Sequence, residues 1–157
     1  MSVTPEEYVE TRLEDQIVWY GRKSSSNQRM YKRLQLITVV SSSSIPFLSA
    51  YTSEYNFIAI IVGVIGVTVA AITAVNSLYK YQENWISYRS TSESLKLQKF
   101  LYLTNTDPYH EEGAFNLLVQ NVEMIISKEN ATWSKQMEKS VDKKPIATTP
   151  SMEKSVI

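Results

Sequence analysis

Apolar residues are gathered in the middle of this chain, in a stretch that is almost free of charge. Between Arg33 and Lys80 the only charged side chain is that of Glu54, near the midpoint of the stretch. A helix that crosses a bilayer needs about 20 mostly apolar residues, each adding about 1.5 Å of length. Residues 57–78 meet this need easily, and residues 34–51 meet it barely. The pattern therefore predicts two membrane-spanning helices, one in each half of the stretch.

The first of these helices, 34–51, is the weaker prediction because it contains four consecutive serines, Ser41–Ser44, followed by Pro46. On hydropathy alone it could instead lie in the membrane interface or re-enter from one side. The positive charges favour a full crossing, since all 16 Lys and Arg residues lie outside the uncharged stretch. Positively charged flanks prefer the cytoplasm, so two spans place both flanks there and the loop 52–56 outside. We expect a cell inner membrane or plasma membrane location, with both termini cytoplasmic.

Polar side chains within 34–51 have two competing interpretations. Successive residues of a helix are about 100° apart, so four consecutive serines cannot all line one pore. Some of them must face a neighbouring helix, where hydroxyl groups can hydrogen-bond and hold helices together. The candidate residues for lining a pore or for packing are Thr38, Ser41, Ser42, Ser43, Ser44 and Pro46.

Small residues recur along the second predicted span, 57–78, at spacings of 4, 3, 4, 3 and 4. We call this stripe the small-residue seam, and its members are Ala59, Gly63, Gly66, Ala70, Thr73 and Ser77. In lipid, close backbone approach over small residues is a main source of helix association. The seam is therefore predicted to meet another helix, either the first span of the same chain or the second span of another copy.

Three further helices are predicted outside the membrane, at 5–33, 80–103 and 111–137. Thr4 is the expected N-cap of the first, with Pro5 in its first turn. Apolar residues at helical spacing are Val9, Leu13, Ile17 and Tyr20 in the first helix, and Phe115, Leu118, Val119, Val122, Ile125, Ile126 and Trp133 in the last. We expect these faces to bury one another in a membrane-proximal bundle.

The predicted fold class is an all-α membrane protein, a two-helix transmembrane hairpin whose long helices extend into a cytoplasmic three-helix bundle. One domain would cover residues 1–139. Residues 140–157 are polar, and the sequence MEKSV of residues 137–141 recurs at 152–156, so a disordered tail is predicted at 140–157.

The sequence contains no pattern typical of an enzyme. It has no Gly-rich phosphate loop, nucleophile elbow, zinc-binding His pair or dinucleotide fingerprint, and it has no cysteine. The single histidine, His110, would need several converging ligands to hold a metal. With a net charge of zero there is no overall basic surface for nucleic acid. We expect no catalytic residues, no metal, no cofactor and no nucleic-acid partner.

Two segments of the cytoplasmic helices resemble a bacterial family of two-span proteins of unknown function, similar to the SLATT membrane effector domains. They are 83–102 and 121–133, and the likeness extends over about Tyr8 to Met137. The matching residues are Trp85, Arg89, Glu93, Leu95, Lys96, Tyr102, Glu123, Ile126, Glu129 and Trp133. The chain departs from the pattern at Gln98, where an acidic residue is expected. The resemblance implies a membrane effector, and pore formation by SLATT relatives is itself a prediction.

Arg89 and Glu93 lie four residues apart, one turn after Trp85. They could form an ordinary ion pair within one helix. We favour a fixed contact between helices, which would also include Glu129 and Trp133.

Two functions follow as hypotheses. In the first, the chain forms a homo-oligomer that makes a membrane pore or channel, because two helices from one copy cannot enclose a path. In the second, it is a non-conducting membrane anchor or scaffold whose bundle recruits or regulates a cytoplasmic protein partner.

Overall fold

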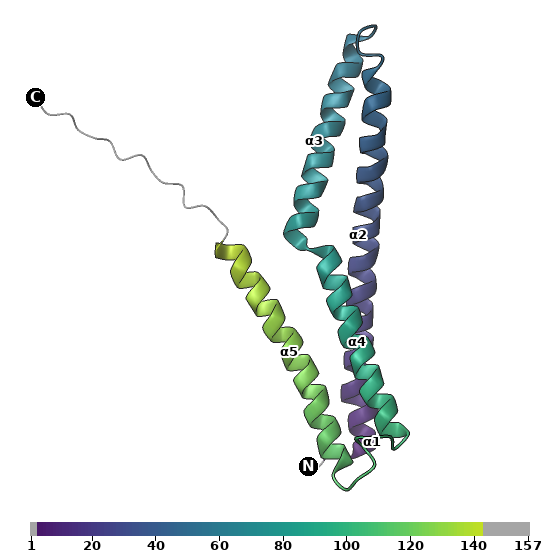
Figure 1. Cartoon of the computed structure of the whole chain (residues 1–157), viewed down its shortest axis with the longest axis vertical. Helices are drawn as coiled ribbons and strands as arrows, with labels where there is room; N and C mark the ends of the chain where they lie inside the picture. Colours follow the sequence, from purple (N-terminus) through teal and green to yellow (C-terminus); the bar gives the residue numbers. More distant parts are fainter. Residues whose placement is uncertain (1–2, 143–157) are drawn as a thin grey trace, which may run out of the picture.

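The computed structural model describes residues 3–142, and it describes side chains for residues 3–131. Every regular element in this part of the chain is a helix, which confirms the all-α prediction. The chain runs up one long rod, turns, and descends beside it (Figure 1). The last helix, predicted to end at 137, continues to Asp142, so residues 140–142 of the predicted tail are helical, and residues 143–157 lie outside the described part of the chain.

The rising rod consists of a short α1 (Pro5–Glu7), a π-helical segment η1 (Tyr8–Leu13) and α2 (Glu14–Ser49). Thr4 is the N-cap, and its hydroxyl accepts a hydrogen bond from the Glu7 N–H at 3.2 Å. Helix α2 continues through Pro46 and ends at Ser49, and residues 50–54 form the turn that follows it. The residues predicted as a cytoplasmic helix and a first span therefore belong to one continuous helical path.

The descending chain begins with α3 (Asn56–Tyr79), which packs antiparallel against the second half of α2 (Figure 1). Its half-buried residues include Ile58, Val62, Ile65, Val69, Ile72 and Asn76, which are separated by 4, 3, 4, 3 and 4 positions. Gly66, next to Ile65, is half-buried as well. Branched apolar residues, rather than the small-residue seam, thus face α2.

A sharp break at Lys80 separates α3 from α4 (Tyr81–Leu103). Lys80 has φ 50° and ψ 41°, a left-handed conformation that costs a non-glycine residue about 1 kcal/mol or more. Two hydrogen bonds hold the break. The Lys80 N–H donates to the Asn76 carbonyl at 3.0 Å, and the Asn84 side-chain amide donates to the Tyr79 carbonyl at 3.0 Å. The sequence had predicted a helix at 80–103 that continues the second span, without this break.

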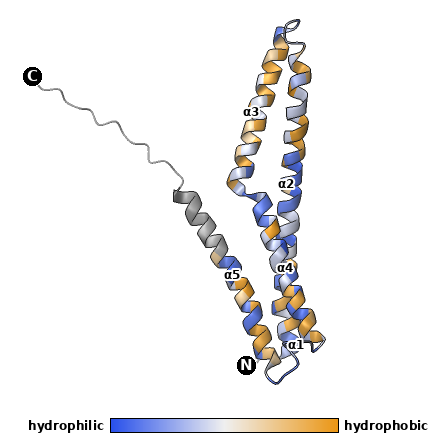
Figure 2. Ribbon diagram, in the orientation of Figure 1, coloured by the Kyte–Doolittle hydropathy of each residue, from blue (hydrophilic) through white to orange (hydrophobic). Residues whose placement is uncertain are grey.

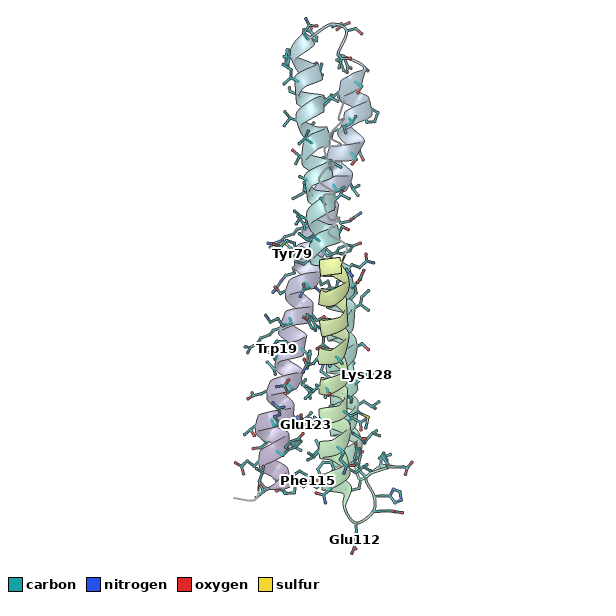
Figure 3. The ribbon with its side chains drawn as sticks, turned by 90° about the vertical axis from the view of Figure 1, so that its left-hand side faces the viewer. Trp19, Tyr79, Glu112, Phe115, Glu123 and Lys128 are labelled. Atoms are coloured by element: carbon teal, nitrogen blue, oxygen red, sulfur yellow. The ribbon has the colours of Figure 1, made fainter. Side chains whose placement is uncertain are left out.

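The core lies at the lower end, where α4 and α5 (Ala114–Asp142) meet η1 and the start of α2 (Figures 1 and 3). Its buried apolar members are Tyr8, Val9, Leu13, Ile17, Tyr20, Leu95, Tyr109, Leu118, Val122 and Ile126. The predicted apolar faces are confirmed where side chains are described, because Phe115, Val119 and Ile125 pack against this core. Helix α5 begins at Ala114 rather than 111, after Gly113 with φ 90°.

Close contact between α2 and α4 depends on small side chains. Ser92, 1% exposed, donates from its hydroxyl to the Ile17 carbonyl at 3.2 Å. A Cβ added at Gly21 would lie 3.8 Å from the Ser92 Oγ. One turn further up, the buried Ser24 hydroxyl donates to the Trp85 carbonyl at 2.9 Å. Hydroxyls and a glycine therefore take part in this helix crossing beside the apolar core residues Tyr20 and Leu95.

Candidate functional site

The hairpin of α2 and α3 exposes many apolar side chains on the sides that do not face the other helix. Among the described residues, one helical stretch, Asn56–Leu103, is long and apolar enough to cross a membrane, and its most apolar part is not buried in the chain. Figure 2 shows this apolar character along α3. The most exposed apolar residues of the hairpin are Leu36, Val40, Phe47, Phe57, Ile60, Val64, Val67 and Leu78. The upper half of the molecule thus lacks a core of its own.

The serine run of α2 is divided between two sides. Thr38, Ser41 and Ser44 are half-buried on the side of α2 that faces α3, whereas Ser42 and Ser43 are exposed. Some of these hydroxyls are already used within the helix. Ser43 and Ser44 donate to the carbonyls of Val39 and Val40 at 2.8 and 2.9 Å, which lowers the cost of a hydroxyl in apolar surroundings.

A hollow of about 610 Å³ lies beside the serine run, between α2 and α3. Six lining residues come from α2 and one from α3, and they are Val39, Val40, Ser43, Ser44, Phe47, Leu48 and Ile65. The lining is mostly apolar, with two hydroxyls that are already bonded to their own helix.

The small-residue seam has no partner helix within the described part of the chain. A Cβ placed on Gly63 or Gly66 would meet no other atom within 4 Å. The other four members, Ala59, Ala70, Thr73 and Ser77, are exposed. Of the two partners predicted for the seam, α2 of the same chain does not occupy it. Contact with another copy stays a prediction.

Below the hairpin, charged and phenolic groups attach α5 to the rising rod. Arg12 lies against Glu123, with Nε–Oε1 and Nη2–Oε2 distances of 3.2 Å each. The Tyr8 hydroxyl donates to the same Glu123 carboxylate at 3.3 Å. Burial, together with the negative charge and hydrogen bond of Glu123, raises the pKa of Tyr8 to about 12. Tyr8 therefore remains a neutral donor well above neutral pH.

A second phenol–carboxylate contact lies further along α5. The Tyr20 hydroxyl donates to the Glu129 carboxylate at 3.4 Å, and burial followed by the charge of Glu129 raises the pKa of Tyr20 to about 12. Burial also raises the pKa of Glu129, and the hydrogen bond from Tyr20 only partly opposes this. A carboxylate that is half removed from water binds protons more readily than a surface one.

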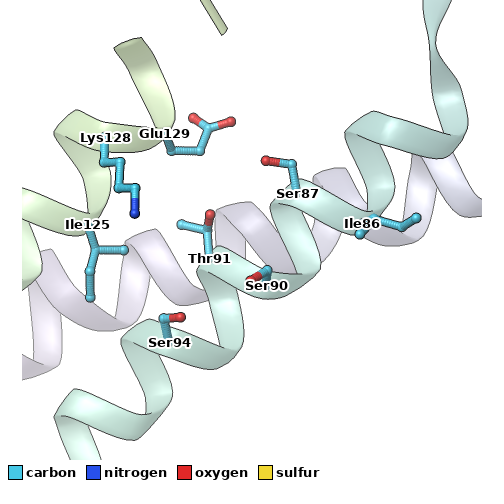
Figure 4. A pocket seen from close by; sticks show the side chains of 8 residues that line it. All are labelled: Ile86, Ser87, Ser90, Thr91, Ser94, Ile125, Lys128 and Glu129. Atoms are coloured by element: carbon cyan, nitrogen blue, oxygen red, sulfur yellow. The ribbon is translucent and has the colours of Figure 1, made fainter. Parts of the chain in front are cut away.

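Glu129 also borders a hollow of about 330 Å³ between α4 and α5. Figure 4 shows Lys128 and Glu129 on α5 facing hydroxyl groups on α4. The lining residues are Ile86, Ser87, Ser90, Thr91, Ser94, Ile125, Lys128 and Glu129. Hydroxyls, an ammonium and a carboxylate thus contribute to the lining of this hollow, which is polar on both helices.

The residues singled out by the family resemblance are only partly brought together. Arg89 pairs with Glu93 on the same helix at 3.0 Å, in the ordinary i,i+4 manner, while Glu129 contacts Tyr20. Lys96 shares the Glu93 carboxylate at 3.1 Å. The expected link from Arg89 to Glu129 is therefore absent from the described contacts. The Trp85 Nε1 is buried without a hydrogen-bond partner among them, and the Trp133 side chain lies outside the described residues.

Several contacts were not predicted from the sequence because they join distant residues. Lys99 on α4 and Glu14 on α2 form an ion pair at 2.5 Å. Gln98 accepts a hydrogen bond from the buried Tyr109, whose hydroxyl also accepts from the Asn121 amide at 2.9 Å. Among the described residues, no three His, Asp or Glu side chains are grouped to hold a metal ion.

Comparison with known proteins gives one match. A family model described as a protein of unknown function, DUF4231, matches residues 15–114, which span nearly all of α2 and the whole of α3 and α4. No curated protein and no solved structure matches the chain.

Proposed function

We propose that this chain, which belongs to the DUF4231 family of unknown function, is a two-pass membrane protein that assembles with copies of itself into a pore. The observation that carries the proposal is the hairpin of α2 and α3, which exposes its apolar residues and buries no core. In water such a surface would be a severe aggregation hazard, whereas a bilayer covers it.

The dimensions of α3 support one crossing, and the crossing by α2 is proposed from its antiparallel packing against α3. Helix α3 has 24 residues and is about 36 Å long at 1.5 Å per residue, more than the roughly 30 Å of a hydrocarbon core. Aromatic residues stand at both of its ends, with Tyr55 and Phe57 above and a stacked Tyr79–Tyr81 pair below. This arrangement is typical of membrane interfaces. The apolar part of α2 is shorter, so the bilayer would thin locally or the helix end would lie in the headgroups.

Assembly is supported by the small-residue seam, which is open to another copy. A single hairpin cannot enclose an aqueous path, so conduction requires several copies around one axis. Ser42 and Ser43 are exposed, and the Ser42 hydroxyl and the oxygen atom of the Ser43 hydroxyl are the polar groups that such an assembly could turn toward the path. The earlier resemblance to SLATT effector domains agrees with this proposal, and it stays a prediction.

Ion flux into liposomes that contain the purified full chain tests the proposal. We expect flux from the wild-type chain, and a particle in detergent heavier than a monomer. Gly63→Leu/Gly66→Leu should abolish both by filling the seam. The matched control is Val64→Leu/Val67→Leu, which adds bulk to a different side of α3 and should conduct. Absence of flux under varied salts, or a strictly monomeric particle, contradicts the pore.

A second candidate function is a non-conducting anchor that holds a cytoplasmic protein. The observation in its favour is the polar hollow between α4 and α5, which lies outside the proposed spans. Crosslinking in native membranes should then recover one specific heterologous partner, and Ser90→Trp should remove it by filling the hollow. If crosslinking recovers only copies of the chain itself, the anchor proposal fails.

A further inference from the structure

Basic side chains on α2 fall into a group that differs from the other cations of the molecule. Five of them lie in the segment directly below the proposed first span, and we call it the basic segment: Arg22, Lys23, Arg29, Lys32 and Arg33. All five are exposed, and α2 has no acidic residue after Asp15. Figure 2 shows the hydrophilic stretch of α2 below its apolar upper half.

None of the five is paired with a carboxylate among the side chains of residues 3–131. Lys23 makes a cation–π contact instead, with its Nζ 5.5 Å from the centre of the Trp19 ring. Elsewhere the cations are used differently. Carboxylates lie 2.5–3.5 Å from the charged nitrogens of Arg12, Lys80, Arg89, Lys96 and Lys99. The unpaired positive charges are thus concentrated at one level of the molecule.

The basic segment is also continuous with the lipid-facing side of the proposed span. Arg22, Arg29 and Arg33 are separated by seven and four residues, so they lie on one side of α2. The same side continues upward as Leu36, Val40 and Phe47, which are 65%, 57% and 68% exposed. At about 1.5 Å per residue, Arg29, Lys32 and Arg33 lie within about 8 Å of Leu34 along the helix. That is close to the depth of the headgroup layer, about 5–8 Å on each side of the hydrocarbon.

We propose that the basic segment binds the phosphate-bearing headgroups of anionic phospholipids in the leaflet nearest α4 and α5. The inference rests on the proposed membrane function and adds the class of lipid that the chain selects. Guanidinium groups match phosphate oxygens through paired hydrogen bonds, and basic clusters next to a span are attracted to anionic lipids. A lipid is the favoured partner over a nucleic acid because the arginine side of α2 continues into the apolar side that contacts acyl chains.

Native mass spectrometry of the full chain in detergent tests the inference. Phosphatidylglycerol and phosphatidylcholine with identical acyl chains are titrated separately, and bound lipids are counted. The wild-type chain should retain phosphatidylglycerol in preference. The variant Arg29→Gln/Lys32→Gln/Arg33→Gln should lose the preference, with an association constant that falls about fivefold for each residue neutralised. The control Arg12→Gln/Arg89→Gln/Lys96→Gln has the same change in net charge and should keep the preference.

Four results would overturn the inference. In the first, the two lipids bind equally to the wild-type chain; in the second, the basic-segment variant keeps its preference; in the third, the control loses as much as the variant. In the fourth, inorganic phosphate or a short RNA binds the basic segment as tightly as phosphatidylglycerol does and displaces this lipid from it. Extraction of membranes with alkaline carbonate distinguishes failure of the lipid-binding inference from failure of the proposed membrane function. A chain released from membranes by carbonate contradicts both, whereas an integrated chain without lipid preference contradicts the headgroup site alone.

Discussion

Replacing Leu118 by alanine should release α5 from the bundle while the other helices stay folded. Leu118 is 0% exposed, and its neighbours on the buried side of α5 are Val122 at 0% and Ile126 at 8%. Full burial of each such side chain contributes about 1.5–3 kcal/mol, or roughly 5–9 kcal/mol for the three together. A buried Leu→Ala change typically costs 2–5 kcal/mol. The substitution therefore removes about half of the contribution of these three residues, while half-buried neighbours such as Phe115 and Val119 keep their contacts with the core.

Amide hydrogen exchange of the full chain in micelles measures this release directly. A cost of about 2 kcal/mol or more should lower protection in α5 by about 30-fold or more, since about 1.4 kcal/mol is a factor of ten. Protection in α3 should stay unchanged. Met124 lies on the same helix and is 65% exposed, so Met124→Ala should change protection by little, within about 0.5 kcal/mol. Equal effects of the two variants, or a loss spread evenly over all helices, would refute this description of the core.

Three other variants test particular contacts. The pKa values of Tyr8 and Tyr20 are raised to about 12, so the folded state favours the neutral phenols. Their contribution to the free energy of unfolding is complete below about pH 10 and is lost as the pH rises through about 12. The chain has ten tyrosines, and their ionisation can be followed by the absorbance of tyrosinate. The variant Tyr8→Phe/Tyr20→Phe should lose two phenols that ionise at high pH. Loss of two phenols that ionise near pH 10 would contradict the raised pKa values of Tyr8 and Tyr20. Lys80→Gly should raise the melting temperature by relieving about 1 kcal/mol of left-handed strain, and a lower value is the contrary result. Ser92→Leu should separate α2 from α4 at a cost of about 1–3 kcal/mol in chemical unfolding, whereas Ser90→Leu, at an exposed position, should cost little.

The helices themselves could be predicted from the sequence because their periodic patterns are strong. The spacing of Leu13, Ile17 and Tyr20, and of Leu118, Val122 and Ile126, identifies buried faces that the structure confirms. The period at which apolar residues recur along a helix depends only on local geometry, so it can be recognised in a single sequence.

Contacts between distant residues could not be predicted in this way. Tyr8 and Glu123 are 115 residues apart, and nothing in the local pattern brings them together. Lys80 in a left-handed conformation was missed because glycine or asparagine is the usual signal for one. The seam was predicted to meet a helix, but small residues show only that close approach is allowed, not which helix approaches.

In the proposed topology both α2 and α3 cross the bilayer, so the turn after α2 and the loop after α4 lie on opposite sides of the membrane. The chain has no cysteine, so a single introduced thiol reports its own location. A membrane-impermeant maleimide applied to intact cells should label Ser53→Cys, in the turn after α2, and should label Thr106→Cys, after α4, only once the membrane is permeabilised. Labelling of both positions from the same side, or recovery of the chain in the soluble fraction, would contradict the two-span hairpin.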